Sequence, residues 1–216
     1  MQCSISSPFP FSPPPIYAIL NLDTLVTPPL SFATSLLSNG ISLIQVRSKR
    51  ATEADLSSLI AELLTLRTDI APHCRIIVND YVELASKLKA DGVHLGQEDT
   101  AVSIARDILG RRAIIGISTH SEAQFERAQR EEVDYIAIGP IFPSPTKANS
   151  QEPLGVRALK SAKFLSKKPL VAIGGITEQN AAEAFLCGAD SIALISALER
   201  TEDLEKTLKE LSAYTA

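Results

Sequence analysis

The amino-acid sequence predicts one α/β domain, a single (β/α)8 TIM barrel. Three observations lead to this prediction: short apolar runs alternate with longer amphipathic segments, the alternation occurs eight times, and polar residues gather just after the apolar runs. A length of 216 residues lies near the small end of the range for such barrels. An open, doubly wound sheet is the alternative that the same alternation allows.

The expected strands are rich in Ile, Val, Leu and Ala and show little polar alternation, as strands buried on both faces do. In chain order they cover residues 16–20, 41–46, 75–79, 92–96, 114–118, 135–139, 170–174 and 191–196. Helices are expected among the amphipathic segments between them, at 52–66, 100–109, 121–132, 177–188 and 201–212. Several of these segments open on Ser or Thr followed by Glu or Asp, which is typical of a helix N-terminus.

The first 15 residues, MQCSISSPFPFSPPP, differ from the rest of the chain in their Pro and Ser content. They lack the basic and continuous apolar regions of a signal peptide. We therefore expect a flexible arm at 1–15, followed by a catalytic barrel domain at 16–216.

The composition and net charge of the sequence exclude some classes of binding partner. A net charge of −4 and a pI near 5.5 argue against nucleic acid or an anionic membrane surface, because both require a basic face. The sequence has no apolar run long enough to span a membrane. Its three cysteines, Cys3, Cys74 and Cys187, lack metal-binding spacing and cannot all pair, which fits a reducing, cytoplasmic location. Formation of a homo-oligomer is left open.

The stretch QVRSKRA at 45–51 follows the apolar run ISLI. Alternate side chains of a strand share one face, so Gln45, Arg47 and Lys49 project to the same side as Leu43. This face changes from apolar to cationic at its C-terminal end. It is either a solvated basic loop or a site that collects anions.

The rest of the chain favours a site. In a (β/α)8 barrel, function lies at the C-terminal ends of the strands. Polar side chains and glycines follow most of the expected strands: Gln45, Arg47, Lys49, Asn79, Asp80, Gln97, Glu98, Asp99, Ser118, Thr119, His120, the run 139–147, Gly174, Gly175 and Ser196.

Asp80 and Asp99 follow neighbouring strands. Either residue alone could be a turn or N-cap residue, but together they resemble the sparse carboxylate ligation that Mg²⁺ prefers. Cations and hydroxyls are expected on the same rim, at Arg47, Lys49, Lys147, Ser118, Ser144 and Thr146. This set of groups suits a diphosphate with its Mg²⁺.

A second anion site is indicated by Gly174 and Gly175 after the seventh strand and by Ile195 and Ser196 at the end of the eighth. Loops in these positions often bind phosphate in barrels. Two anion sites on one rim imply two phosphorylated reactants. No hydrolytic triad or Rossmann or P-loop motif is present, and His94 is expected to be a hydrogen-bonded core residue.

Seven blocks of this sequence resemble those of the thiamine phosphate synthase family, and the similarity extends over nearly the whole chain from Ile16. The blocks are QVRSK, VNDYVELA, ADGVHLGQED, IIGISTH, DYIAIGPIFPSPTK, VAIGGI and GADSIALIS. The resemblance implies a (β/α)8 transferase that joins hydroxymethylpyrimidine diphosphate to hydroxyethylthiazole phosphate. Thiamine phosphate and pyrophosphate are the implied products.

The resemblance also implies roles for individual residues. Asp80 and Asp99 would hold Mg²⁺, and Gln45 would contact the pyrimidine. The diphosphate would be bound by Arg47, Lys49, Asn79, Ser118 and Lys147, of which Arg47, Lys49, Ser118 and Lys147 are the expected catalytic residues. The thiazole phosphate would lie near Ser144, Thr146, Gly175, Ile195 and Ser196.

Several positions bear on the alternatives. Ser144 stands where the family usually has Thr, and YAILNLD differs from the commoner Y-x-I-T-D pattern. The related thiazole tautomerase typically lacks the acidic pair and has His in place of Pro140. Asp80, Asp99 and Pro140 therefore favour the synthase, with the tautomerase and a non-catalytic barrel that binds a phosphorylated ligand as alternatives.

Overall fold

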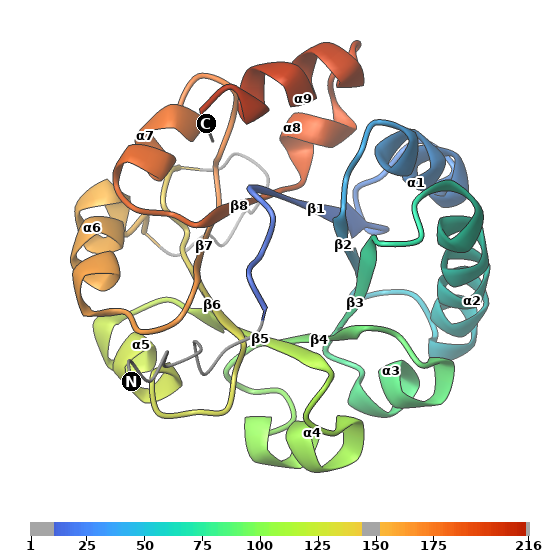
Figure 1. The fold of residues 1–216 in the computed structure, drawn as a ribbon, viewed down its shortest axis with the longest axis horizontal. Coiled ribbons are helices and arrows are strands. Elements are labelled where there is room, and N and C mark those ends of the chain that lie inside the picture. Colours follow the sequence, from blue (N-terminus) through green and yellow to red (C-terminus); the bar gives the residue numbers. More distant parts are fainter. Residues whose placement is uncertain (1–10, 144–151, 215–216) are drawn as a thin grey trace, which may run out of the picture.

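Eight parallel strands close into one barrel in the order β1 to β8 in the computed structural model, which describes residues 11–143 and 152–214 (Figure 1). The strands are β1 (Ile16–Asn21), β2 (Leu43–Arg47), β3 (Arg75–Asn79), β4 (Gly92–Leu95), β5 (Ile114–Thr119), β6 (Tyr135–Ile138), β7 (Leu170–Ile173) and β8 (Ser191–Leu194). Pairing of β1 with β8, in which Tyr17 lies opposite Ala193, closes the ring. The predicted (β/α)8 barrel is confirmed, and the open sheet is excluded.

Helices surround the strands as an outer ring (Figure 1). They are α1 (Pro29–Ser38), α2 (Glu53–Ile70), α3 (Val82–Leu88), α4 (Val102–Leu109), α5 (Glu122–Ala128), α6 (Gly155–Leu165), α7 (Ala181–Leu186), α8 (Ser196–Glu199) and α9 (Leu204–Ser212). The side chains of Thr52 and Ser121 cap α2 and α5 as the sequence indicates. Within the described residues, no helix is both long and apolar enough to cross a membrane.

Alternation along the strands divides the buried side chains into two cores. One core packs between the strands and the helices. The other fills the barrel interior and consists of Tyr17, Ile19, Leu43, Ile77, Ile114, Tyr135, Ala137, Val171 and Ala193. The interior is therefore a packed core beneath the rim, as in other barrels of this class.

Phe11 also packs against this interior core, with its ring centroid 6.0 Å from that of Tyr135. The segment that leads into β1 crosses the end of the barrel (Figure 1), where Pro15 accepts a hydrogen bond from the Ile192 N–H. This end is the one at which the strands begin. Residues 1–10, the remainder of the expected arm, lie outside the described part of the chain.

Three aspartates form a repeated clamp at the same end. Each directly precedes an even-numbered strand, accepts a backbone N–H from the preceding strand and pairs with a basic residue on an outer helix. The three sets are Asp91 with Ile76 and Arg67, Asp134 with Ile115 and Arg106, and Asp190 with Leu170 and Lys163. Each clamp therefore ties two strands and a helix together at one carboxylate.

Asp134→Ala tests the clamp. The variant removes the acceptor of the Ile115 N–H and the carboxylate partner of the largely buried Arg106 guanidinium, which keeps only backbone carbonyl acceptors. We therefore expect the free energy of unfolding to fall by about 2–4 kcal/mol. Urea denaturation measures the change. Glu205→Ala, which breaks an exposed pair with Lys209, is the matched control and should lower the free energy of unfolding much less. Equal losses in the two variants would contradict the clamp.

Candidate active site

The C-terminal ends of the strands bring together the polar residues that the sequence singles out. Gln45 and Arg47 lie on β2, Asn79 ends β3, His94 lies on β4 and Ser118 on β5. Hydrogen bonds link several of these strands at the rim. Lys49 Nζ lies 2.5 Å from Asp80 Oδ2, and His94 Nε2 lies 2.8 Å from Ser118 Oγ. The cationic end of β2 therefore faces the acidic loop after β3.

Asp23, just after β1, fixes the conformation of the QVRSK segment. Its carboxylate accepts hydrogen bonds from Ser48 Oγ at 2.6 Å and from the Lys49 backbone N–H at 2.8 Å. Burial alone would raise the pKa of Asp23, but these bonds and the nearby arginines outweigh it and lower the pKa. Asp23 is not among the residues that the sequence patterns single out; the only local signal for it is its place two residues after the first strand.

Arg47 has a neutral amide as its hydrogen-bond acceptor, and its carboxylate partner lies farther away. Its Nη1 donates to the Asn21 side-chain oxygen at 2.8 Å, whereas the nearest Asp23 oxygen is 3.7 Å away. Asn21 is itself held by Thr24, which donates to the Glu199 carboxylate. Arg47 therefore keeps a positive charge that can act on an anion at the rim.

Asp80 and Asp99 share a site. Burial raises the pKa of Asp80, and the adjacent Asp99 carboxyl raises it further, although Lys49 opposes both effects. Burial would also raise the pKa of Asp99, but hydrogen bonds from Asp80 and from the Gly96 N–H outweigh it and lower the pKa. The two carboxyl groups thus compete for one proton, which Asp80 holds more strongly.

This pair could hold a divalent cation. Two adjacent carboxylates that repel each other suit a hard cation, which relieves the repulsion that otherwise retains a proton. Asp80 also has a φ of 66°, an uncommon conformation for a residue other than Gly. Across residues 11–143 and 152–214, no cluster of three or more His, Cys, Asp or Glu side chains could hold a metal.

The side chains of Asn79 and His94 differ in their hydrogen-bond partners. Asn79 Nδ2 is buried and has no hydrogen-bond partner in the described part of the chain, so it is available to an acceptor from a ligand. His94 is buried with Nδ1 2.8 Å from the Tyr135 hydroxyl and Nε2 bonded to Ser118. The predicted hydrogen-bonded core imidazole is confirmed. Burial lowers the pKa of His94 to about 4.

The glycine pair after β7 has a packing role. A Cβ on Gly174 would lie 2.5 Å from Pro140, and one on Gly175 would lie 2.4 Å from the Pro143 carbonyl oxygen. Their backbones therefore approach the segment after β6 more closely than a side chain permits. Ile195 precedes α8, and Ser196 is its first residue rather than part of β8. Ser144, Thr146 and Lys147 lie outside the described residues.

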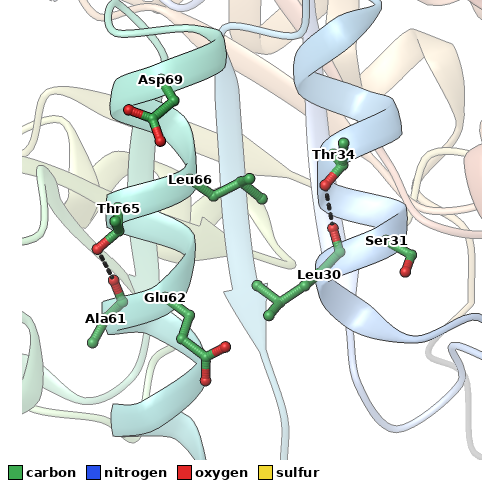
Figure 2. Close-up of a pocket in the computed structure, with 8 residues that line it drawn as sticks. All are labelled: Leu30, Ser31, Thr34, Ala61, Glu62, Thr65, Leu66 and Asp69. Atoms are coloured by element: carbon green, nitrogen blue, oxygen red, sulfur yellow. Dashed lines mark hydrogen bonds between the residues drawn. The ribbon is translucent and has the colours of Figure 1, made fainter.

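A separate hollow of about 590 Å³ lies outside the barrel, between α1 and α2 (Figure 2). It is lined by Leu30, Ser31, Thr34, Ala61, Glu62, Thr65, Leu66 and Asp69. Thr34 and Thr65 donate to carbonyl groups of their own helices, as the dashed lines show. The charged groups are two carboxylates, which would repel a phosphate. This hollow is therefore unsuited to an anionic ligand.

Comparison with known proteins identifies the family. The sequence profile described as thiamine monophosphate synthase matches residues 16–198. The chain belongs to the thiamine monophosphate synthase family. Its curated relatives include the thiamine-phosphate synthase of Chlorobium phaeovibrioides, which is 40% identical over 176 residues that cover 82% of this chain and 83% of the relative. That of Koribacter versatilis is 36% identical over 190 residues, covering 86% and 89%.

A solved member of the thiamine monophosphate synthase family has the same fold. The thiamine phosphate pyrophosphorylase of Pyrococcus furiosus superimposes with a TM-score of 0.81 at 32% identity, covering 92% of this chain and 94% of that one. The thiamine phosphate pyrophosphorylase from Bacteroides thetaiotaomicron has a TM-score of 0.61 at 17% identity, which shows the fold alone. The strands that carry the candidate site thus belong to a barrel shared within this family.

The low pKa of His94 predicts acid sensitivity. Between pH 6.5 and about 4 the unfolded chain binds a proton that the folded chain does not, so stability is lost on acidification. From pH 8 to pH 5 the contribution is about 2 kcal/mol. Urea denaturation in EDTA at the two pH values measures it. His94→Gln should reduce the pH dependence by this amount, whereas His73→Gln, on an exposed turn, should not. An unchanged pH dependence in His94→Gln would contradict the assignment.

Proposed function

We propose that the rim of this barrel couples hydroxymethylpyrimidine diphosphate to hydroxyethylthiazole phosphate, forming thiamine phosphate and releasing pyrophosphate with the help of Mg²⁺. Family membership identifies the chain as a transferase enzyme that synthesises thiamine phosphate. The observation that carries the assignment of the site is the cluster of Lys49, Asp80 and Asp99 at the strand ends, beside Arg47. It combines a carboxylate pair for a cation with positive charges for a diphosphate.

The cationic side would receive the diphosphate. Asn21 orients the Arg47 guanidinium, Asp23 holds the backbone at Lys49, and the Asn79 amide has a donor to spare. Ser118 adds a hydroxyl from β5, and Lys147 is proposed to complete this set. Gln45 is proposed to contact the pyrimidine. Such preorganised donors stabilise the charge that develops on a departing pyrophosphate.

Asp80 and Asp99 would hold Mg²⁺. The metal, when bound, would neutralise charge on the diphosphate and so make it a better leaving group. Lys49 lies 2.5 Å from Asp80 and would join the carboxylate side of the site to the phosphate side. No protein nucleophile is required, because the thiazole nitrogen forms the new bond to the pyrimidine methylene carbon as the bond from that carbon to the diphosphate oxygen breaks. The protein's contribution is to position the two rings and stabilise the leaving group.

The second substrate would bind on the opposite part of the rim. Gly175, Ile195 and Ser196 surround the ends of β7 and β8, and Ser144 and Thr146 are proposed to join them. Phosphorylated small molecules are thus the proposed partners, in the cytoplasm. The free thiols of Cys74 and Cys187 are consistent with this location. No observation on the described residues favours the tautomerase or a non-catalytic barrel.

Turnover by the purified protein tests the function. With both phosphorylated precursors and Mg²⁺, we expect thiamine phosphate and pyrophosphate in equal amounts, and neither product in EDTA. Asp80→Asn should lower kcat by about 100-fold or more without lowering the melting temperature, because Asn tolerates a positive φ and removes the carboxylate repulsion. Asp69→Asn, on the outer helix α2, is the control. Metal-independent turnover in Asp80→Asn would remove the metal assignment.

Ser196→Asp tests whether there are two phosphate sites. The added charge should repel the thiazole phosphate and raise its KM about tenfold or more, while the KM for the pyrimidine diphosphate changes less than about twofold. Ser196→Asn has nearly the same shape without the charge and is the matched control. Steady-state kinetics with each substrate varied in turn measure both constants. Equal effects on the two KM values would contradict separate sites.

A further inference from the structure

Five side chains from five strands form one continuous chain of hydrogen bonds beneath the rim. Gln45 Nε2 on β2 donates to the Tyr17 hydroxyl on β1 at 2.8 Å, and the Tyr17 and Tyr135 hydroxyl oxygens lie 3.0 Å apart. The Tyr135 hydroxyl, on β6, lies 2.8 Å from His94 Nδ1, and His94 Nε2 lies 2.8 Å from Ser118 Oγ. The chain therefore connects the proposed pyrimidine contact, Gln45, to the proposed diphosphate contact, Ser118.

Counting protons gives this chain a direction. Each tyrosine hydroxyl has one proton to donate, and a neutral imidazole donates from one nitrogen only. If Tyr17 donates to Tyr135, Tyr135 donates to His94 Nδ1 and His94 donates from Nε2 to Ser118, then every proton within the chain has an acceptor. With the Gln45 amide oriented as it is here, Nε2 toward Tyr17, the reversed order would make Tyr17 accept from both Gln45 and Tyr135, and its own proton would lack an acceptor among the described side chains. An orphaned buried donor is costly.

We propose that Tyr135 is the positioning residue that holds His94 in its Nε2–H tautomer, while Gln45 and Tyr17 satisfy each other so that the Tyr135 proton is left for His94 Nδ1. Ser118 then accepts from His94 and directs its own hydroxyl proton to the substrate. This inference rests on the proposed function, because the diphosphate is the acceptor that the Ser118 hydroxyl would meet. Neither tyrosine contacts the reacting atoms. Tyr135 would act through Ser118, by fixing which of its groups faces the ligand.

The surroundings bury the two tyrosines and the histidine and keep all three neutral. Tyr17 and Tyr135 are each about 1% exposed or less, and their rings meet edge to face at 5.9 Å. Burial raises the pKa of both hydroxyls, so they stay protonated. Gly116 leaves room for Tyr135, since a Cβ there would lie 2.0 Å from the Tyr135 ring. The His94 ring stacks on Tyr135 at 5.6 Å, which sets the imidazole plane.

The tautomer of His94 can be measured without substrate. In protein with ¹⁵N-labelled histidine at pH 8, NMR distinguishes a protonated ring nitrogen from an unprotonated one, and His94→Gln identifies which signals belong to His94. We expect the proton on Nε2 and an unprotonated, hydrogen-bonded Nδ1. A proton on Nδ1 would overturn the proposal. This result does not depend on turnover, so it stands apart from the proposed function.

A double-mutant cycle tests whether Tyr135 acts through Ser118. Tyr135→Phe should lower kcat about tenfold and change each KM less than about threefold, because the substrate still binds but Ser118 is no longer held in one orientation. In a Ser118→Ala background, the same substitution should change kcat less than about twofold. Equal losses in both backgrounds would indicate a general structural effect and overturn the proposal, as would wild-type turnover by Ser118→Ala.

Tyr17→Phe is the matched control for Tyr135→Phe. It also deletes one buried hydroxyl, but Tyr135 can still donate to His94 Nδ1. We expect the His94 nitrogen signals to keep the Nε2–H pattern in Tyr17→Phe and the Nδ1 signal to lose its hydrogen-bonded character in Tyr135→Phe. Identical His94 signals in the wild type and Tyr135→Phe would show that the tyrosine does not hold the imidazole, and would contradict the proposal.

Discussion

Closure of the barrel is the constraint on which the site depends. Once β1 pairs with β8, every second side chain of each strand must enter one interior of fixed width. Bulky apolar groups fill its lower part, where Leu43 and Ile77 lie. Two residues further along the same strands, the inward positions carry Gln45 and Asn79. The change from core to site thus follows from strand phase alone, and a shift of one residue would turn these side chains toward the helices.

The carboxylates at the two ends of the barrel lie in opposite environments. Where the strands begin, Asp91, Asp134 and Asp190 are each satisfied by a backbone N–H and a basic side chain. Where the strands end, Asp80 and Asp99 are held against each other, and Asp80 also adopts a positive φ. Unfavourable arrangements of this kind persist only when surrounding structure supports them. The clamps tie neighbouring strands to the outer helices at the end of the barrel away from the rim.

Much of this organisation can be predicted from sequence because it depends on periodicity. Apolar runs located all eight strands, and their ends placed Gln45, Asp80, Asp99 and Ser118 at one rim. Contacts between residues distant in sequence could not be predicted in this way. Asp23 is an ordinary residue after a strand until the fold brings Ser48 to it, and nothing local to Gly116 reveals that the Tyr135 ring occupies its missing side chain.

His94 shows how a core residue can also serve a site. A buried imidazole with both nitrogens bonded is normally explained by packing alone, and the sequence supports that interpretation. In this barrel the two partners differ, because Tyr135 belongs to the closed interior and Ser118 to the open rim. The hydrogen bond that Tyr135 makes to His94 Nδ1 would therefore decide whether Ser118 presents its proton or its lone pairs to a ligand at the rim. The packed interior and the chemistry at the rim are thus joined through one neutral ring.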